Sequence, residues 1–101
     1  MIRHMVMFEL LEQAEGKSRV ENAHTVQQAL ASMAPLCDAQ RFEVTLNEKR
    51  DALSKEIDVM LLAEFDSWEK LANYHNHPQF KQVIATVRPL RKNRWAVDSV
   101  V

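Results

Sequence analysis

The sequence is poor in glycine and cysteine, and each shortage excludes whole classes of site. Gly16 is the one glycine in 101 residues. A P-loop or a GxGxxG turn needs several glycines to bring backbone N–H groups close to phosphate, so nucleotide cofactors held in those ways are not expected. Cys37 is the one cysteine, which excludes an internal disulfide, a CxxC redox pair and a zinc ribbon. Cysteine usage of this kind suits a reducing compartment, and we expect a cytoplasmic protein.

The sequence also lacks an excess of charge of either sign. Lys and Arg total 13 against 14 Asp and Glu, which leaves a formal net charge of −1. No global field is available to hold a polyanion or an acidic membrane, so nucleic acid and membrane partners are not expected. Residues 1–9 have charge inside an apolar stretch and no small-residue cleavage site, so we expect neither a signal peptide nor a membrane span there.

What the sequence does contain is enough apolar residues for one core. The chain is 47% hydrophobic and 27% charged, a composition typical of a globular protein. Its length is that of one ordinary domain, so we expect residues 1–101 to form a single domain.

Four segments show the two-residue alternation that is typical of strands. They are residues 2–10, 41–46, 57–65 and 94–101. The first and third are apolar on both faces at their centres, which predicts central strands covered on both sides. The second and fourth carry charged residues, Arg41, Glu43 and Asp98 among them, as edge strands do.

Three segments repeat apolar residues at intervals of three and four, which predicts amphipathic helices. Residues 18–34 form the first, with Ser18 as N-cap, Glu21 in capping-box register and Val20 on the apolar stripe. Pro35 limits this helix, because the residue before a proline is disfavoured in helical conformation.

The two other helices are short and adjoin at a proline. Asp66 or Ser67 caps the second, which ends near Asn76 and places Trp68, Leu71, Ala72 and His75 on its inner face. Pro78 suits the first turn of the third, whose inward stripe is Phe80, Val83, Ile84 and Val87, and Pro89 interrupts it.

The order of these elements favours an α+β fold of ferredoxin-like type. With right-handed crossovers, it gives a four-stranded antiparallel sheet with the helices on one face. The second apolar face then needs a partner, and a second copy packed sheet to sheet is the natural one. We therefore predict a homodimer, with Met5, Met7 and Met60 as adaptable filling of the interface.

Three segments make the sequence resemble the stress-responsive α/β barrel domain family, also called Dabb or dimeric α+β barrel proteins. They are Ile2-Arg3-His4-Met5-Val6-Met7-Phe8, Phe65-Asp66-Ser67 leading to Tyr74-His75-Asn76-His77-Pro78, and Val87-Arg88-Pro89-Leu90. The resemblance spans essentially the whole chain. It implies a ferredoxin-like unit whose sheet closes into a barrel across a dimer.

The resemblance also implies where a site would lie. The family includes stress-induced proteins without a clear biochemical role, and a plant branch that cyclises polyketide chains without a metal or organic cofactor. In that branch a first-strand histidine, a tyrosine four residues before the proline and a histidine two residues after it line a pocket between sheet and helices. His4 and Tyr74 match the first two positions, but Phe80 stands at the third and can neither accept nor donate a proton.

A more distant resemblance of fold is to antibiotic-biosynthesis monooxygenases and haem-degrading proteins. Trp68 suggests that comparison. However, the first strand has no asparagine, and Ile84 stands where a haem-ligating histidine would be needed. We expect no cofactor.

Each candidate residue has a structural interpretation beside the functional one. His4 can act as an acid or base in an apolar space, or be a core histidine satisfied by one partner. Tyr74 can transfer a proton or simply pack. His75 and His77 point to nearly opposite sides of a helix, so we expect a turn at His77 and Pro78 and no metal site. The basic run Arg88, Arg91, Lys92 and Arg94 is either an anion clamp or a set of cations at a helix C-terminus.

Two hypotheses about function follow. The first is a non-catalytic homodimer that acts in the stress response, or that binds a small hydrophobic ligand between sheet and helices. The second is a cofactor-independent cyclase, lyase or monooxygenase-like enzyme that uses His4 and Tyr74 on a hydrophobic oxygenated substrate. Under either hypothesis, the pocket between sheet and helices is expected to be lined by His4, Trp68, Tyr74, His77 and Phe80.

Overall fold

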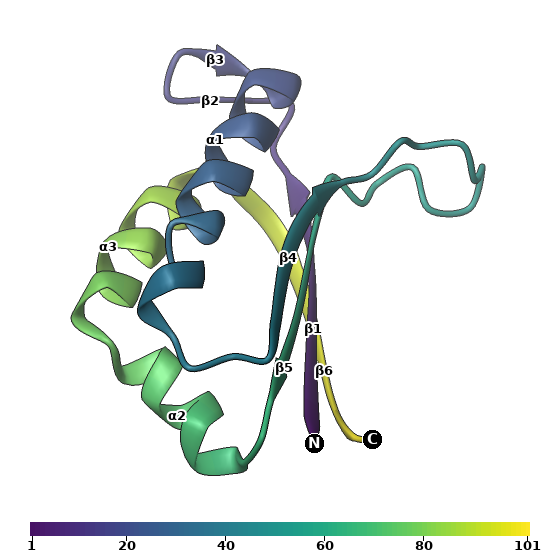
Figure 1. Ribbon diagram of the computed structural model, residues 1–101. Coiled ribbons are helices and arrows are strands. Elements are labelled where there is room, and N and C mark those ends of the chain that lie inside the picture. Colours follow the sequence, from purple (N-terminus) through teal and green to yellow (C-terminus); the bar gives the residue numbers. More distant parts are fainter.

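The computed structural model describes residues 1–101 and contains one main sheet with all of its helices on one side (Figure 1). The sheet strands are β1 (Ile2–Leu10), β4 (Arg41–Leu46), β5 (Val59–Phe65) and β6 (Arg91–Val100). They are antiparallel in the order β4-β5-β1-β6, so β1 and β5 are central, as the alternation predicts. The ferredoxin-like α+β fold expected from the sequence is thereby confirmed.

The helices are α1 (Arg19–Ala31), α2 (Trp68–Asn76) and α3 (Pro78–Val87), with short 3-10 turns at Ala34–Leu36 and Arg88–Leu90. The capping box predicted at Ser18 and Glu21 is present. Ser67, rather than Asp66, caps α2 by accepting a hydrogen bond from the Lys70 N–H. These side chains satisfy N–H groups that have no partner within the helix, which explains why the helices begin where they do.

Several expectations about local structure are wrong. The last strand begins at Arg91, three residues earlier than predicted, so most of the basic run lies on a strand and only Arg88 follows a helix. Val20 is 70% exposed because α1 presents Asn22 to the core at this end, where its amide donates to the Ala14 carbonyl. Ala72, expected on the inner face of α2, is exposed as well.

A small hairpin was not predicted. Strands β2 (Gln13–Ala14) and β3 (Lys17–Ser18) pair through a two-residue turn in which Glu15 and Gly16 both have positive φ. Two positive φ values suit a tight hairpin, but glycine is the only local sequence signal for it here.

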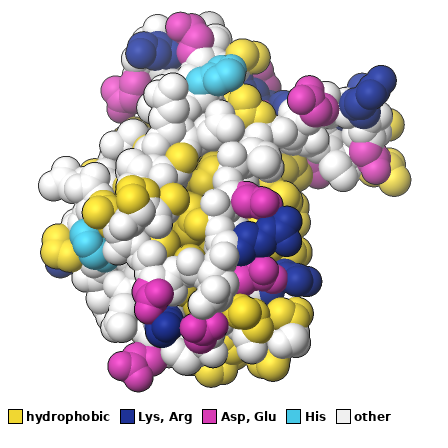
Figure 2. Space-filling model, in the orientation of Figure 1, with side chains coloured by type: hydrophobic (Ala, Val, Ile, Leu, Met, Phe, Trp, Pro, Cys, Tyr) yellow, Lys and Arg dark blue, Asp and Glu magenta, His cyan; other side chains and the backbone are white.

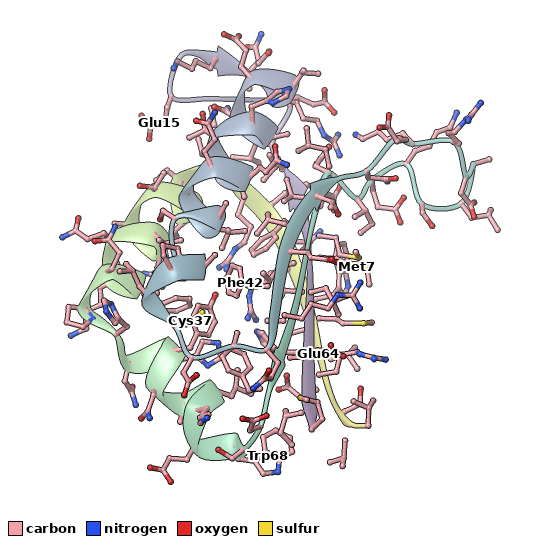
Figure 3. The ribbon with its side chains drawn as sticks, viewed as in Figure 1. Met7, Glu15, Cys37, Phe42, Glu64 and Trp68 are labelled. Atoms are coloured by element: carbon pink, nitrogen blue, oxygen red, sulfur yellow. The ribbon has the colours of Figure 1, made fainter.

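The two faces of the sheet differ in what covers them. Even-numbered residues of β1 face the helices and are buried, whereas its odd-numbered residues lie on the other face and are half-buried. The open face has an apolar centre, because Met5 lies opposite Leu62 and Val97, and Met7 opposite Met60 and Trp95. Figure 3 shows Met7 on this side of the sheet and Phe42 on the side of the helices.

A buried carboxylate joins three parts of the chain at one end of the sheet. Asp58 is almost fully buried and accepts hydrogen bonds from the Leu10 backbone N–H at 2.8 Å, from Arg19 Nε at 3.0 Å and from Lys49 Nζ at 2.6 Å. It therefore ties the end of β1 and the start of α1 to the connection between β4 and β5.

Candidate functional site

The first candidate, His4, is held by an aspartate from the opposite end of the sequence. Because His4 and Asp98 are direct partners in the β1–β6 ladder, their side chains project from the same face. His4 Nδ1 lies 2.5 Å from Asp98 Oδ1, and the exposed fractions of the two side chains are 3% and 40%. With the carboxylate as acceptor, the Nδ1–H tautomer is favoured and Nε2 is left to accept or give a proton.

Two aromatic side chains of α2 lie beside His4, and a third, from α3, packs on them. The His4 ring centroid lies 5.1 Å from that of His75 and 6.5 Å from that of Tyr74, both in edge-to-face orientation. Phe80 packs at 5.0 Å from Tyr74 and 5.1 Å from His75. Helix α2 thus delivers two polar rings to His4, and α3 covers them with an apolar one.

Little free space remains around these rings. The cavity bordered by His4, Tyr74, His75, Phe80 and Arg94 has a volume of about 20 Å³. That is room for about one water molecule. In this conformation, the space between sheet and helices is filled by side chains rather than open to a ligand.

Burial sets the protonation of the two helix residues. Desolvation raises the pKa of the Tyr74 phenol well above its ordinary value. Tyr74 therefore stays protonated and is a poor proton donor. Burial also lowers the pKa of His75, and the neighbouring His4 and Arg94 lower it further. His75 is therefore a neutral imidazole at physiological pH, and it can act as an acceptor.

Two residues expected to line the pocket lie elsewhere. Trp68 is 54% exposed at the start of α2, and Figure 3 shows it at the end of the molecule, away from the centre of the sheet. His77 ends α2 and caps α3, where its Nδ1 accepts a hydrogen bond from the Gln79 N–H at 3.0 Å. The expected turn at His77 and Pro78 is confirmed, and the His77 imidazole caps the helix that follows it.

His77 borders a separate hollow between α2 and the connection from α1 to β4. This hollow has a volume of about 350 Å³ and also contacts Cys37, Lys70 and Tyr74. Burial raises the pKa of the Cys37 thiol, which makes it a poor nucleophile. Lys70 is paired with Asp38 at 2.8 Å and with Asp66 at 3.2 Å, so its charge is already neutralised.

The sequence alone did not identify Asp98, His75 and Arg94 as members of one site. The available signal for Asp98 was its place on the fourth strand, since pairing with the first strand brings some residue of that strand opposite His4. His75 was expected on the inner face of α2, which is correct, but its distance from His4 depends on how α2 packs on the sheet. No three His, Cys, Asp or Glu side chains converge as metal ligands.

The fold is shared with solved structures of low sequence identity. A dimeric ferredoxin-like protein of unknown function from Bacteroides fragilis superposes with a TM-score of 0.81 and 19% identity, over 97% of this chain and 93% of that one. A Dabb family protein from Mesorhizobium loti gives 0.73 and 18%, over 99% and 95%. A protein from Nitrosomonas europaea, provisionally labelled an antibiotic biosynthesis monooxygenase, gives 0.77 and 12%, over 100% and 98%.

Two further comparisons complete the assignment. No curated protein is significantly similar in sequence to the chain. None of the helices combines the length and apolarity that a membrane span requires. The model of the Stress responsive A/B Barrel Domain matches residues 2–101, and the chain therefore belongs to the Dabb family.

Proposed function

We propose that this chain is a non-catalytic homodimeric barrel protein that acts in the stress response, in the cytoplasm. The observation that carries the proposal is the open face of the sheet. Six apolar side chains occupy its centre without any helix to cover them: Met5, Met7, Met60, Leu62, Trp95 and Val97. A contiguous apolar patch of this kind marks an interaction surface.

The border of the open face suits a second copy of the same chain. At one end, Arg3 pairs with Glu64 at 2.8 Å and Arg41 with Glu43 at 3.0 Å. At the other end, Glu9 lies 3.7 Å from Lys92. Each end presents both signs of charge, so a two-fold related copy meets complementary groups at either end. The Bacteroides fragilis relative is described as dimeric, which supports the same arrangement.

A small hydrophobic ligand between sheet and helices receives less support from the geometry. The cavity of about 20 Å³ at His4 cannot hold a molecule larger than water. Such a ligand would have to displace Phe80 or His75 from the aromatic cluster, and both rings make contacts there that would be lost. We therefore favour a homodimer that holds no ligand between its sheet and helices.

Light scattering on the purified protein tests the homodimer directly. We expect a molar mass twice that of the 11.7 kDa chain at micromolar concentration. The reason is that the apolar open face is removed from water only when a second copy covers it. A mass equal to that of one chain throughout the micromolar range would overturn the proposal.

A second candidate function rests on a different observation, the buried pair of His4 and Asp98. A carboxylate 2.5 Å from Nδ1 orients the imidazole and leaves Nε2 free to take a proton, which is the arrangement of a histidine general base. His75 supplies a neutral imidazole beside it. These groups favour a cofactor-independent enzyme of the cyclase, lyase or monooxygenase-like class, with His4 as the base and Tyr74 as a hydrogen-bond donor. Its substrate has to displace the Phe80 ring, because the cavity of about 20 Å³ holds no more than a water molecule.

Hydrogen exchange in acetylacetone tests the second candidate with a small probe. His4 would remove the proton from the central carbon to form an enolate, and deuterium from D₂O would return to that carbon. We expect NMR to show faster exchange with the wild type than with His4→Ala, because the variant lacks the base. Trp68→Ala is the control, since Trp68 lies outside the site. Equal rates for the wild type and His4→Ala would exclude this chemistry.

A further inference from the structure

The connection between β4 and β5 forms an arm that stands away from the body of the molecule. We call residues 47–57 the arm. Figure 1 shows it extending on the side of the sheet opposite the helices, and Figure 2 shows it projecting from the surface with charged side chains of both signs. Hydrophobic side chains lie along the edge of the body below it (Figure 2).

The arm has an ordered shape although it lies outside the core. The Asn47 side-chain amide donates to the carbonyls of Ser54 at 2.9 Å and Ile57 at 2.8 Å, and its oxygen accepts from the Lys49 N–H at 3.0 Å. Nearer the tip, Asp51 Oδ1 accepts from the Leu53 N–H at 2.8 Å. A segment held in place by its own hydrogen bonds loses little conformational entropy on binding.

The tip of the arm presents an apolar side chain that the monomer does not use. Leu53 is 88% exposed, more than any other large hydrophobic residue in the chain. A single exposed leucine is ordinary on a protein surface. Here it stands on a preformed arm that reaches beyond the sheet, so it is placed to contact whatever covers the open face.

A hollow at the base of the arm is a second, independent sign that the arm contacts whatever covers the open face. It has a volume of about 420 Å³, and its apolar lining consists of Met7, Leu46, Ile57 and Met60. Met7 and Met60 are also at the centre of the open face. The hollow is therefore continuous with the surface that the proposed dimer buries.

The charges of the arm suit a second copy of the chain better than a polyanion or an acidic membrane. The arm contains three basic and three acidic residues, namely Lys49, Arg50 and Lys55 with Glu48, Asp51 and Glu56. This balance gives no attraction for a polyanion or an acidic membrane. It does suit the mixed charges that border the open face, such as Arg3 with Glu64 and Arg41 with Glu43.

We propose that the arm of each protomer clasps the second copy, so that Leu53 is buried against the partner and the hollow at the base of the arm is covered. The inference rests on the proposed homodimer. Because a two-fold axis repeats every contact, both arms bind, and each substitution in the arm counts twice per dimer.

Sedimentation velocity on Leu53→Asp tests the clasp. A carboxylate buried without a partner is costly, so we expect the dimer dissociation constant to rise about tenfold or more. Leu36→Asp is the matched control, because Leu36 is exposed on the side of the helices. It should leave the dissociation constant unchanged. The same constant for Leu53→Asp and the wild type would overturn the clasp while leaving the dimer intact.

A spectroscopic measurement separates the clasp from the dimer itself. An environment-sensitive dye on Leu53→Cys, in a Cys37→Ser background, should shift its emission to the blue as the concentration passes through the dimerisation range. A dimer whose dye emission stays constant would exclude contact at Leu53. A wild-type chain that remains monomeric would instead overturn the homodimer, and the clasp with it.

Discussion

Replacing Leu62 by lysine is expected to convert the homodimer into monomers. Leu62 lies at the centre of the open face, opposite Met5 on one side and Glu43 on the other. In the dimer, the ammonium group would be held against the apolar side chains of the second copy. The opposite residue, Glu43, is already paired with Arg41 at 3.0 Å, so the added charge has no free partner. Burial of such a charge costs several kcal/mol, which corresponds to a rise in the dissociation constant of about a thousandfold.

The measurement is sedimentation velocity over a wide concentration range, with circular dichroism to establish that the variant folds. In the monomer, Leu62 is half-buried and its neighbours leave the new side chain a route to water, so we expect the fold to survive. Leu36→Lys, on the side of the helices, provides the control and should remain dimeric. If Leu62→Lys sediments as a dimer with wild-type affinity, the open face is not the interface.

Replacing Asp58 by asparagine is expected to cause the largest loss of monomer stability. The carboxylate accepts hydrogen bonds from Leu10, Arg19 and Lys49, and its side chain is 3% exposed. The neutral amide removes the charge that both cations face and directs N–H groups towards other donors. Breaking a buried ion pair in this way costs about 3–5 kcal/mol, which urea denaturation monitored by circular dichroism can measure.

Stability should also fall in acid because of Asp58. Burial alone would raise the pKa of this carboxyl, but the hydrogen bonds from Arg19, Lys49 and Leu10 outweigh it, and the pKa lies below its ordinary value of 3.8. Between the lowered and the ordinary value, the unfolded chain binds more protons than the folded one, so acidification favours unfolding. The contribution is complete above the ordinary pKa and disappears as the pH falls through the lowered one.

Comparison with the variant isolates this effect. Asp58→Asn should show a shallower decrease in the free energy of unfolding between pH 5 and pH 2, a window set by carboxyl pKa values of about 4. Glu48→Gln, an exposed carboxylate in the arm, should follow the wild type. Parallel pH profiles for the wild type and Asp58→Asn would mean that other carboxyl groups govern acid unfolding.

The sequence by itself determined which strands are central and where the first helix begins. A central strand is covered on both faces, so adjacent residues such as Val6 and Met7 are both apolar. The cap at Ser18 depends only on Glu21 three residues later. Periodicity also predicted that His4 faces inwards and His75 lies on the inner side of α2. All of these features depend on short stretches of chain.

Periodicity was less informative about which apolar residues are buried and how closely they pack. Val20 continues the apolar stripe of α1 and Trp68 that of α2, yet both are exposed because the core ends before it reaches them. Likewise, the sequence showed that Phe80 removes a polar group, but not that its ring and those of Tyr74 and His75 pack closely enough to leave a cavity of about 20 Å³.

Only the tertiary structure decided which side chains meet. His4 and Asp98 are separated by 94 residues, and a shift of one residue in the β1–β6 register would place Asp98 on the other face of the sheet. The distance from His75 to His4, and the projection of the arm on the side of the open face, depend in the same way on packing between remote segments. A local pattern specifies the direction in which a side chain points, whereas its neighbours are set by register and by the packing of helices on the sheet.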